Sequence, residues 1–498
     1  MISAERMAQV DENAAALGIP RKQLMESSGN AVAREVRAVA DPGARVAVVA
    51  GRGNNGGDAF VAARFLSAYD VSVHLLGRAE TIATDIAREN WDALGRAGID
   101  REAVGDSRDV DLPDADVVVD AMLGTGVTGA LRDPEATAAR AINDAEATVV
   151  AVDVPSGVDA DTGVAPGAAV AADRVVTFHD QKPGLDALEA AVTVADIGIP
   201  AAAERYLGPG DMRPVRRGPP ADDARVFVVG GGPYTGAPAL AAQAALRAGA
   251  DLSFVAAPET VADGIQGFAE DLIVQSYDGE RLAPDQVDAL VETAEAYDDV
   301  VVLGPGLGTA DETVEAAERF LESFSGRAVV DADAVSVVPA VETDAELVCT
   351  PNRKELAEMG GPEIEGADEL GERADEIADF AADLGHVVVA KAREDVVADG
   401  RKSADDFRAH QNSQSSEDGE RTRVSRAGTS GMTVGGTGDT LAGAIAGLLA
   451  GHDAFAAACM GTYANGRAAE LLDDRRGGLV ASDLLDALPR AVWGDRDE

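Results

Sequence analysis

Two glycine-rich loops, one in each half of the chain, decide the expected fold. Gly51-Arg-Gly-Asn-Asn-Gly-Gly-Asp58 directly follows the apolar run at residues 46–50, and Gly435-Gly-Thr-Gly-Asp439 opens the apolar run at residues 440–450. Each loop places small residues and an acid where a loop meets a helix. Bare backbone N–H groups and the helix dipole suit such a place to a phosphorylated ligand. Because the two loops differ in type, we expect two active sites in one polypeptide.

Outward from the first loop, predicted strands and helices alternate. The spacing of Ala, Leu, Met and Val predicts helix over residues 9–40. The further expected helices are residues 58–68 and 81–97, and the expected buried strands are residues 46–50, 71–76, 117–120 and 148–152. Apolar runs separated by helices indicate a parallel sheet covered on both faces. The first half therefore predicts an α/β domain of three layers with a Rossmann-like, doubly wound sheet.

A second alternating series follows a segment rich in proline and glycine. We predict a first domain at residues 1–208, a linker at 209–220 and a second domain at 221–498. The strands expected in the second domain are residues 226–229, 252–256, 300–303, 328–330 and 387–390. Residues 401–422 form a polar tract without apolar periodicity, which predicts a disordered surface insertion.

The charge of the chain excludes some partners. Its 498 residues carry 42 Lys and Arg against 88 Asp and Glu, a net charge of −46, with only five lysines. Such a surface repels nucleic acid and anionic lipid, so we expect neither as a partner. The excess of acids is most simply a solvated surface, and it suits a cytoplasm rich in salt. We therefore expect a halophilic archaeal origin and a fold that needs molar salt, which screens the self-repulsion.

The remaining composition excludes other classes. The two cysteines, Cys349 and Cys459, form neither a metal-type pair nor a disulfide framework. The N-terminus has no apolar signal core, and the longest uncharged stretch is broken by glycine and proline. We expect a cytoplasmic protein of at least two domains, and a homo-oligomer.

The first loop matches the dinucleotide fingerprint in its glycine spacing, which alone is a weak signal. A dehydrogenase would also place an acid at the tip of the second strand, to hold the ribose. That strand ends in Leu76-Gly77-Arg78, so a plain redox domain is disfavoured.

Polar residues after successive strands are more informative. Asn55, Asp120, Asp153 and Ser156 each follow or end an expected strand. The carboxyl ends of the strands meet at one crevice in a doubly wound sheet, so these side chains are expected to converge. Oxygen donors of this kind suit a hard monovalent or divalent cation. Any one of them could instead be a helix cap.

These segments resemble the N-terminal epimerase domain of the bifunctional NAD(P)H-hydrate repair enzymes, over about residues 1–208. The resemblance rests on Leu24-Met-Glu-Ser-Ser-Gly29, the Asn-Asn-Gly-Gly-Asp loop, Asp153-Val-Pro-Ser-Gly157, Lys182-Pro-Gly-Leu185 and Asp196-Ile-Gly-Ile-Pro200. Ala59 stands where the family usually has glycine, a small departure.

The resemblance implies a reaction that interconverts the R and S forms of hydrated NADH or NADPH. It implies that Asp153 moves the proton and that potassium is held by Asn55, Asp120 and Ser156. The implied substrate contacts are Asn54, Asn55, Gly56, Gly57, Asp58, Gly124, Thr125, Gly126, Val127, Thr128, Gly129, Ala130 and Asp153.

In the second half, neither a Walker loop nor a protein-kinase catalytic loop occurs in the sequence. Phosphoryl chemistry would therefore use another scaffold, and the Gly-Thr-Gly-Asp turn at a helix start supplies one. Its N–H groups can stabilise charge on a transferred phosphoryl group, and Asp439 can accept a hydroxyl proton. The simpler alternative makes the glycines a tight helix start and Asp439 its cap.

This half resembles the ribokinase-like NAD(P)H-hydrate dehydratases over about residues 221–490. The resemblance implies that Asp439 is catalytic and that Glu355 acts near magnesium. The implied contacts to the hydrate are Ala237, Gly306, Asn352 and Asp439, and those to the nucleotide are Lys391, Gly435, Gly436, Thr437 and Gly438. Arg353 and Ala392 depart from the usual His and Gly, which puts the details of these contacts in question.

The implied dehydration is phosphorylation of the hydrate's hydroxyl by the co-substrate ADP, followed by loss of phosphate, with Mg²⁺ as its cofactor. K⁺ is the cofactor implied at the first site. Two alternatives remain from the sequence. One is a ribokinase-like small-molecule kinase with an N-terminal regulatory nucleotide-binding domain, which would release a phosphorylated product. The other makes the N-terminal half a non-catalytic ligand-binding module.

Overall fold

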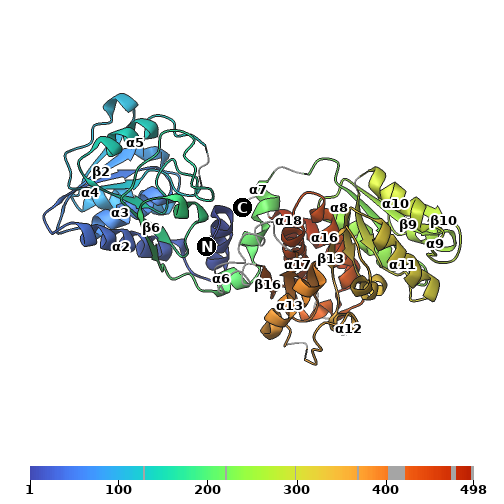
Figure 1. Ribbon diagram of the computed structural model, residues 1–498. Coiled ribbons are helices and arrows are strands. Elements are labelled where there is room, and N and C mark those ends of the chain that lie inside the picture. Colours follow the sequence, from blue (N-terminus) through green and yellow to red (C-terminus); the bar gives the residue numbers. More distant parts are fainter. Residues whose placement is uncertain are drawn as a thin grey trace. The chain divides into compact units, whose positions relative to one another are not determined.

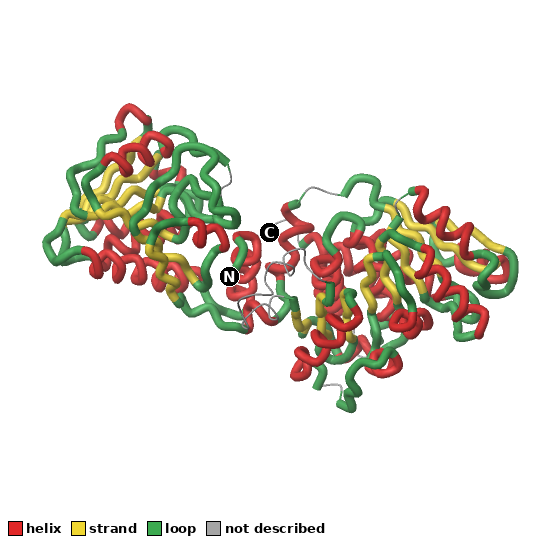
Figure 2. The backbone as a smooth tube through the Cα atoms, viewed as in Figure 1, coloured by secondary structure: helices red, strands yellow, loops and turns green. Residues whose placement is uncertain are grey.

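The computed structural model describes residues 1–126, 129–218, 221–297, 299–366, 369–401, 421–472 and 478–494. The chain divides into two compact units, a first unit, Met1–Ala201, and a second unit, Ala202–Glu498. Each unit is built around its own sheet, with helices packed against the strands (Figure 1; Figure 2).

The first unit has a parallel sheet of seven strands in the order β3-β2-β1-β4-β5-β6-β7. The strands are β1 (Arg45–Ala50), β2 (Asp70–Leu76), β3 (Asp100–Val104), β4 (Val117–Ala121), β5 (Thr148–Val152), β6 (Arg174–Phe178) and β7 (Ala191–Ala195). The helices are α1 (Ala4–Ala16), α2 (Arg21–Val39), α3 (Asn54–Phe65), α4 (Asp85–Arg96) and α5 (Glu135–Asp144). The reversal of strand order next to β1 is the doubly wound arrangement.

Helices cover both faces of this sheet, which explains its uninterrupted apolar strands. Val118 and Met122 pack with Ile142 of α5 on one face. Helices α2, α3 and α4 lie together on the opposite side in Figure 1, and α3 contacts β1, β2 and β4. Every residue of β4 is buried as a result.

The second unit has nine strands in the order β10-β9-β8-β11-β12-β13-β14-β15-β16. The strands are β8 (Arg225–Val229), β9 (Leu252–Pro258), β10 (Ile273–Tyr277), β11 (Val300–Leu303), β12 (Arg327–Val330), β13 (Glu346–Cys349), β14 (Val387–Ala390), β15 (Asp395–Asp399) and β16 (Thr422–Ser425). The last two pair antiparallel and the others parallel, so the sheet is mixed. The helices are α6 (Ala202–Arg205), α7 (Arg213–Arg217), α8 (Gly236–Ala248), α9 (Glu259–Gln266), α10 (Val287–Ala296), α11 (Asp311–Ser323), α12 (Arg353–Glu358), α13 (Ala374–Leu384), α16 (Thr437–Leu449), α17 (Ala454–Glu470) and α18 (Ala481–Trp493).

Alternate residues of one strand serve the two faces of this sheet. Val226 and Val228 of β8 join the core made with helices α8, α16, α17 and α18. Phe227 and Val229 join the core made with α10 and α11 on the other face. The period of two therefore places one continuous apolar strand between two helical layers. The structure therefore contains two three-layer α/β domains, as predicted.

The predicted linker differs from the structure. Its residues form a short 3₁₀ helix, Pro209–Met212, and α7, both within the second unit. Met212 and Val215 are buried in the core of that unit, and the backbone N–H of Leu207 donates to Val424 O. The division falls after Ala201 because two apolar side chains in a segment rich in proline and glycine pack into the core of the second unit, in elements that contact α17 and α18.

Some expected boundaries also change. Residues 9–40 form two helices, α1 and α2, separated around Gly18 and Pro20, and α3 begins at Asn54 rather than at residue 58. Short or partly polar strands were not predicted, namely β3, β6, β7, β10, β13, β15 and β16.

Residues 402–420 of the expected insertion lie outside the described residues. The ends of that tract are structured, which narrows the predicted bounds: Thr422 begins β16, and Asp399 N donates to Arg421 O (2.9 Å). Cys349 and Cys459 are both buried. Within the described ranges, no helix has the length and apolar character needed to cross a membrane.

Candidate active sites

The first candidate site lies at the carboxyl ends of β1, β4, β5 and β6, which are neighbours in the sheet. Asp120, in β4, is fully buried. The Ser156 hydroxyl donates to Asp120 Oδ1 (2.7 Å), and the Ser156 N–H donates to Oδ2 (2.8 Å). Burial raises the pKa of Asp120 to about 6, although the bonds from Ser156 and Met122 act to lower it.

Asn55 joins this group through the backbone of Leu123. The Asn55 side-chain amide donates to Leu123 O (3.0 Å), and the Leu123 N–H donates to Ser156 Oγ (3.0 Å). Side chains on Gly51 or Gly56 would collide with neighbouring backbone, so glycine lets the first loop lie directly against the Met122–Leu123 segment. The structure therefore brings Asn55, Asp120 and Ser156 together.

Asp153 lies beside this group, immediately after β5, and has a positive φ of 64°. Lys182 Nζ is 2.8 Å from Asp153 Oδ1, and the Thr177 hydroxyl donates to the same oxygen (3.1 Å). Lys182 is fully buried and also donates to Phe178 O (2.9 Å) and to Asp180 O (3.3 Å). A strained backbone and a buried lysine thus hold the Asp153 carboxylate in one orientation.

Two further carboxyl groups interact with Asp153. Burial, followed by the charges of Asp153 and Asp11, raises the pKa of Asp58 well above its usual value. Burial and Asp153 likewise raise the pKa of Asp11, on α1, to about 6, against the opposing charges of Arg21, Lys182 and His179. Carboxyl groups of this kind can hold a proton near neutral pH.

The other predicted contacts of the first site lie around this group. Asn54 accepts a hydrogen bond from the Thr84 hydroxyl (2.9 Å), and Gly124 lies against the Asn55 side chain. Val127 and Thr128 lie outside the described residues. The described remainder of their loop consists of Gly124, Thr125, Gly126, Gly129 and Ala130.

The second candidate site lies at the carboxyl ends of β12, β13 and β14, beside the start of α16. Asp331 follows β12 and is buried, and Lys391 Nζ lies 2.6 Å from its Oδ1. The Thr350 hydroxyl donates to the same oxygen (2.7 Å). Burial alone would lower the pKa of Lys391, but Asp331 and Glu355 raise it, so the lysine stays protonated.

Asp439 lies in the first turn of α16, after Gly436 in a left-handed conformation (φ 98°). Burial, and then the charges of Asp331, Asp333 and Glu355, raises the pKa of Asp439 to about 7, against the lowering effect of Lys391. A carboxyl group that titrates near neutral pH is suited to accept a proton.

Buried polar contacts fix this first turn of α16. The Thr440 hydroxyl donates to Asn465 Oδ1 (2.9 Å), and the Asn465 amide donates to Thr437 O (3.2 Å). A side chain on Gly438 would approach Lys391 Nζ, so the glycine turn and the lysine are direct neighbours. Gly435 and Gly436 precede this turn, as the predicted nucleotide loop requires.

Asn352 and Glu355 have a local role that the sequence did not reveal. Asn352 is the N-cap of α12: its Oδ1 accepts from the N–H groups of Lys354 and Glu355, and Glu355 Oε2 accepts from Asn352 N (2.8 Å). This capping box directs Glu355 toward Asp331 and Asp333, whose charges, after burial, help to raise its pKa.

The predicted hydrate contact Gly306 lies in the loop after β11, and the predicted hydrate contact Ala237 lies in the first turn of α8. Gly306 has φ 73°, and a side chain there would collide with the backbone of Tyr234, which precedes Ala237 on α8. Gly308 N donates to Asp333 Oδ2 (2.8 Å), which connects this loop to the carboxyl cluster. The structure thus brings both residues to the edge of the second site.

Of the two departures from the family pattern, the Arg353 side chain has a structural use, whereas the contact of Ala392 is made by its backbone, as glycine could make it. Arg353 Nη1 donates to Glu365 O (2.6 Å), so this side chain ties down the segment after α12. Ala392 N donates to Asp395 Oδ1 (3.0 Å), within the turn from β14 to β15. Among the described residues, no cluster of three or more His, Cys, Asp or Glu side chains has the arrangement of a metal site.

Sequence comparisons cover both units. A family profile described as YjeF-related protein N-terminus matches residues 21–184, and one described as NAD(P)H-hydrate dehydratase matches residues 226–490. Bifunctional NAD(P)H-hydrate repair enzymes from Methanothermobacter thermautotrophicus and Archaeoglobus fulgidus are each 40% identical to this chain. Those alignments cover 98% and 99% of this chain, and 94% and 98% of the relatives. The chain belongs to the family of bifunctional NAD(P)H-hydrate repair enzymes.

The chain therefore has both domains of a bifunctional NAD(P)H-hydrate repair enzyme, an epimerase and a dehydratase. The small-molecule kinase considered from the sequence is not favoured. A crystal structure of an ADP/ATP-dependent NAD(P)H-hydrate dehydratase from Bacillus subtilis, co-crystallized with ATP/Mg²⁺, is 25% identical. It aligns with 56% of this chain and 95% of its own, at a TM-score of 0.44.

Two residues of the first site were not among the predicted site residues. Lys182 belongs to a motif that carries the resemblance, so the motif was a usable signal for this residue. The motif did not predict that Lys182 is buried against Asp153. Asp11 lies on α1, outside residues 21–184 of the family match. Its closeness to Asp153 is tertiary, and no local pattern indicated it.

Proposed function

We propose that this protein repairs hydrated NADH and NADPH in two steps. The first unit interconverts the R and S forms, and the second unit dehydrates the S form with ADP, giving NAD(P)H, AMP and phosphate. The observation that carries the proposal is a carboxylate–lysine pair with one buried partner at the strand ends of each unit, in a chain related to the repair enzymes over its full length.

In the first unit, Asp153 is proposed to move the proton. Inverting the hydrated carbon requires a bond to that carbon to break and re-form, with a proton removed at one stage and returned at another. Lys182 and Thr177 orient the carboxylate through Oδ1. Asp58 and Asp11, with raised pKa values, supply nearby groups that can hold the proton between these stages.

Potassium is proposed to bind at Asn55, Asp120 and Ser156. The donor set fits, because these residues and Leu123 O bring carboxylate, hydroxyl, amide and carbonyl oxygens together. Asp120 is buried with a raised pKa, and a cation beside it would stabilise its charged form. The ion would supply positive charge and hold the loop at residues 122–124 against the first glycine loop.

In the second unit, Asp439 is proposed to take the proton of the hydrate's hydroxyl as that oxygen attacks the terminal phosphorus of ADP. AMP leaves when the P–O–P bond breaks. The C–O bond then breaks with phosphate as the leaving group, and loss of a proton from the adjacent ring carbon restores the double bond. Lys391, whose Nζ lies next to Gly438, and the N–H groups of residues 435–438 would neutralise the transferred phosphoryl group.

Magnesium is proposed to bind near Glu355, whose electrostatic neighbours include the carboxylates of Asp331 and Asp333. Oxygen donors shared between two carboxylates and substrate phosphates suit this ion. It would neutralise the phosphates of ADP during transfer.

The test is to mix the protein with hydrated NADH, ADP and Mg²⁺ and to follow the absorbance of the reduced nicotinamide. We expect absorbance to return with equal amounts of AMP and phosphate. Accumulation of a stable phosphorylated product would support the kinase instead. With R hydrate alone, absorbance should return only while the first unit is active.

We also propose that the chain acts as a homo-oligomer. Strand β10 lies at one end of the order of the second sheet, and Leu252, Phe268 and Ile273 near it are apolar and exposed. Such an edge favours pairing with another chain. Light scattering coupled to size-exclusion chromatography tests it, and a monomer at micromolar concentration would contradict it.

A further inference from the structure

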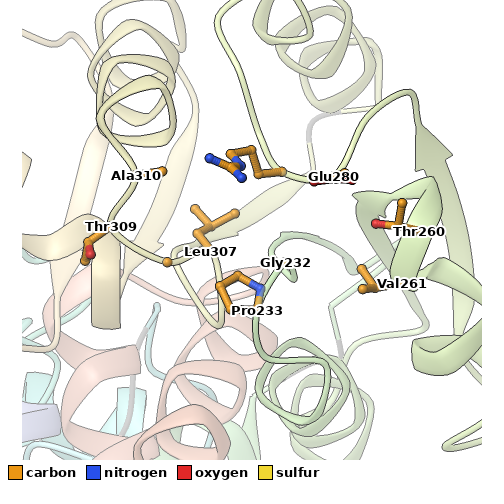
Figure 3. A pocket seen from close by; sticks show the side chains of 10 residues that line it. Gly232, Pro233, Thr260, Val261, Glu280, Leu307, Thr309 and Ala310 are labelled. Atoms are coloured by element: carbon orange, nitrogen blue, oxygen red, sulfur yellow. The ribbon is translucent and has the colours of Figure 1, made fainter.

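A cavity of about 460 Å³ opens in the second unit, next to the second site. Its walls come from four segments: the loop after β8 (Gly232 and Pro233), the start of α9 (Thr260 and Val261), the loop after β10 (Glu280 and Arg281), and residues 307–310 before α11. In Figure 3, Thr309 and Ala310 lie on one side of the space, with Thr260 and Val261 opposite them and Leu307 and Pro233 between. This volume is in the range of small-molecule sites.

The cavity and the carboxyl cluster lie side by side along one edge of the same sheet. The cavity is built on the ends of β8 to β11, and the cluster on the ends of β12 to β14. Gly308 belongs to both, since it lines the cavity while its N–H donates to Asp333. From β12 to β9 there are three strand spacings of about 4.8 Å each, or roughly 14 Å.

That distance matters because the proposed reaction needs two nucleotide-like ligands at once. The glycine turn and Lys391 take the phosphates of ADP on the β14 side of Asp439. The hydrated ring must then reach Asp439 from the other side, across Gly306. The remainder of the hydrate, two riboses and a diphosphate with adenine at its far end, can extend across the interval toward β9.

The cavity wall has the chemistry that an adenosine group requires. Leu307, Pro233 and Val261 give apolar surface for a flat base. Arg281 supplies a cation, with a side chain that is 45% exposed and only loosely paired, at 3.3 Å, with Glu312. Glu280 and the Thr260 hydroxyl can bond ribose hydroxyls.

We propose that this cavity holds the adenosine half of the NAD(P)H hydrate while the hydrated ring lies at Asp439. In this arrangement Arg281 contacts a phosphate group of the hydrate. The assignment rests on the proposed function and adds the place of the distal half of the substrate. It makes Arg281 and Thr260 determinants of hydrate affinity in the dehydratase.

The experiment uses two variants of the full-length chain and a matched control for each. Thr260→Trp fills the cavity from an exposed position, and Glu259→Trp places the same ring on the neighbouring exposed residue, which does not line it. Arg281→Ala removes the cation. Arg319→Ala removes an arginine that is equally exposed (43%) and is also paired with a carboxylate, that of Asp288.

We expect Thr260→Trp and Arg281→Ala to raise the KM for the hydrate about tenfold, with kcat and the KM for ADP little changed and both controls like wild type. A rise in the KM for ADP would assign the cavity to the nucleotide and overturn the proposal, as would an unchanged KM for the hydrate. Titration with NADPH, followed by its fluorescence, tests the cavity without turnover. If Thr260→Trp bound NADPH as tightly as wild type, the subsite would be rejected, whether or not the chain had dehydratase activity. If the chain had dehydratase activity and the variants kept the wild-type KM for the hydrate, the subsite would be rejected but the proposed function would stand.

Discussion

Each unit holds a lysine–aspartate pair at the carboxyl ends of its strands, but the two lysines are held differently. Lys182 is fully buried and has three oxygen partners: it donates hydrogen bonds to Phe178 O and Asp180 O, and it forms an ion pair with Asp153 Oδ1. Lys391 is 18% exposed, and among the described residues it has one acceptor, Asp331 Oδ1. An ammonium group has three donors, so Lys182 is saturated and Lys391 is not.

This difference indicates different tasks for the two lysines. A saturated, enclosed lysine can only orient its aspartate, which makes Lys182 a positioning residue for Asp153. Lys391 has N–H donors that are not used by acceptors among the described residues, and it lies next to the backbone of Gly438. It can therefore turn toward a ligand phosphate. Under the proposed function, the same two residue types would serve a proton transfer in one unit and a phosphoryl transfer in the other.

The largest expected effect is on Asp439. Asp439→Asn keeps the shape of the side chain and removes the proton acceptor, so dehydration should fall by about a hundred- to ten-thousand-fold. Epimerisation should stay within about twofold of wild type, because the first cluster belongs to the other unit. The two rates are measured separately on the same protein, the first by absorbance recovery and the second by chromatography of the R and S forms. Equal loss of both in a folded variant would show that the sites are not separate.

Replacing Lys182 should abolish epimerisation and also destabilise the first unit. Lys182→Met leaves the partly buried Asp153 carboxylate without its partner, and breaking such pairs typically costs about 3–5 kcal/mol. Dehydration of the S form should persist. Thermal unfolding and both activities are the measurements.

The double variant Lys182→Met with Asp153→Asn separates the two effects. It removes both charges, so stability should largely return while epimerisation stays absent. Retained epimerisation in Lys182→Met would contradict the positioning role. The matching change Lys391→Met should instead raise the KM for ADP, because the lysine of the second unit serves the ligand.

The distribution of successful predictions follows from the range of the interactions involved. The strand runs at residues 46–50, 117–120 and 226–229 were predicted correctly because their burial on both faces leaves a local, continuous apolar pattern. Strands β6 and β13 were missed, and neither their length nor their charged first residue explains this, since β8 shares both features and was predicted. The predicted linker lies within the second unit because Met212 and Val215 pack into the core of that unit, which no local pattern indicates.

The candidate sites divide in the same way. Asn55, Asp120, Asp153 and Ser156 could be grouped from the sequence, because a parallel sheet brings successive strand ends together. That Lys182 is buried against Asp153, or that Asp11 reaches the cluster from α1, depends on packing of distant segments. The role of Asn352 as a helix cap competes with its predicted substrate contact, and a motif alone does not decide between them.

The pH dependence of dehydration tests the assignment of Asp439 as the proton acceptor. The pKa of Asp439 in the free protein is raised to about 7, and the residue must be ionised to accept a proton. The kcat/KM for dehydration should therefore fall about tenfold per pH unit below 7 and level off above it. Because the raised pKa favours the protonated folded form, its contribution to stability is complete below the unfolded value and is lost as pH rises through about 7. A dehydration profile that stays flat from pH 5 to 8 would contradict the assignment of Asp439 as the proton acceptor.

Exchange of potassium for sodium should affect one unit only. At constant molar ionic strength the screening of the acidic surface is unchanged, so any difference reports a specific site. Epimerisation should fall a few-fold in sodium chloride, and dehydration by the second unit should not change. In Asp120→Asn the difference between the two salts should disappear, whereas a persistent difference would place the potassium effect elsewhere.

The smallest effect is expected from removing residues 403–420, which lie in sequence between Lys391 and the glycine turn. The described ends of this tract are joined without it: Arg421 Nη1 donates to Arg401 O (2.7 Å), and Arg401 forms ion pairs with Asp399, Glu346 and Asp453. Joining residues 402 and 421 through a short glycine–serine loop should keep the melting temperature within about 2 °C of wild type. Arg401→Ala, which removes those ion pairs, serves as the control and should lower it more. A large loss of dehydration in the deletion variant alone would show that the tract contributes to the ADP side of the second site.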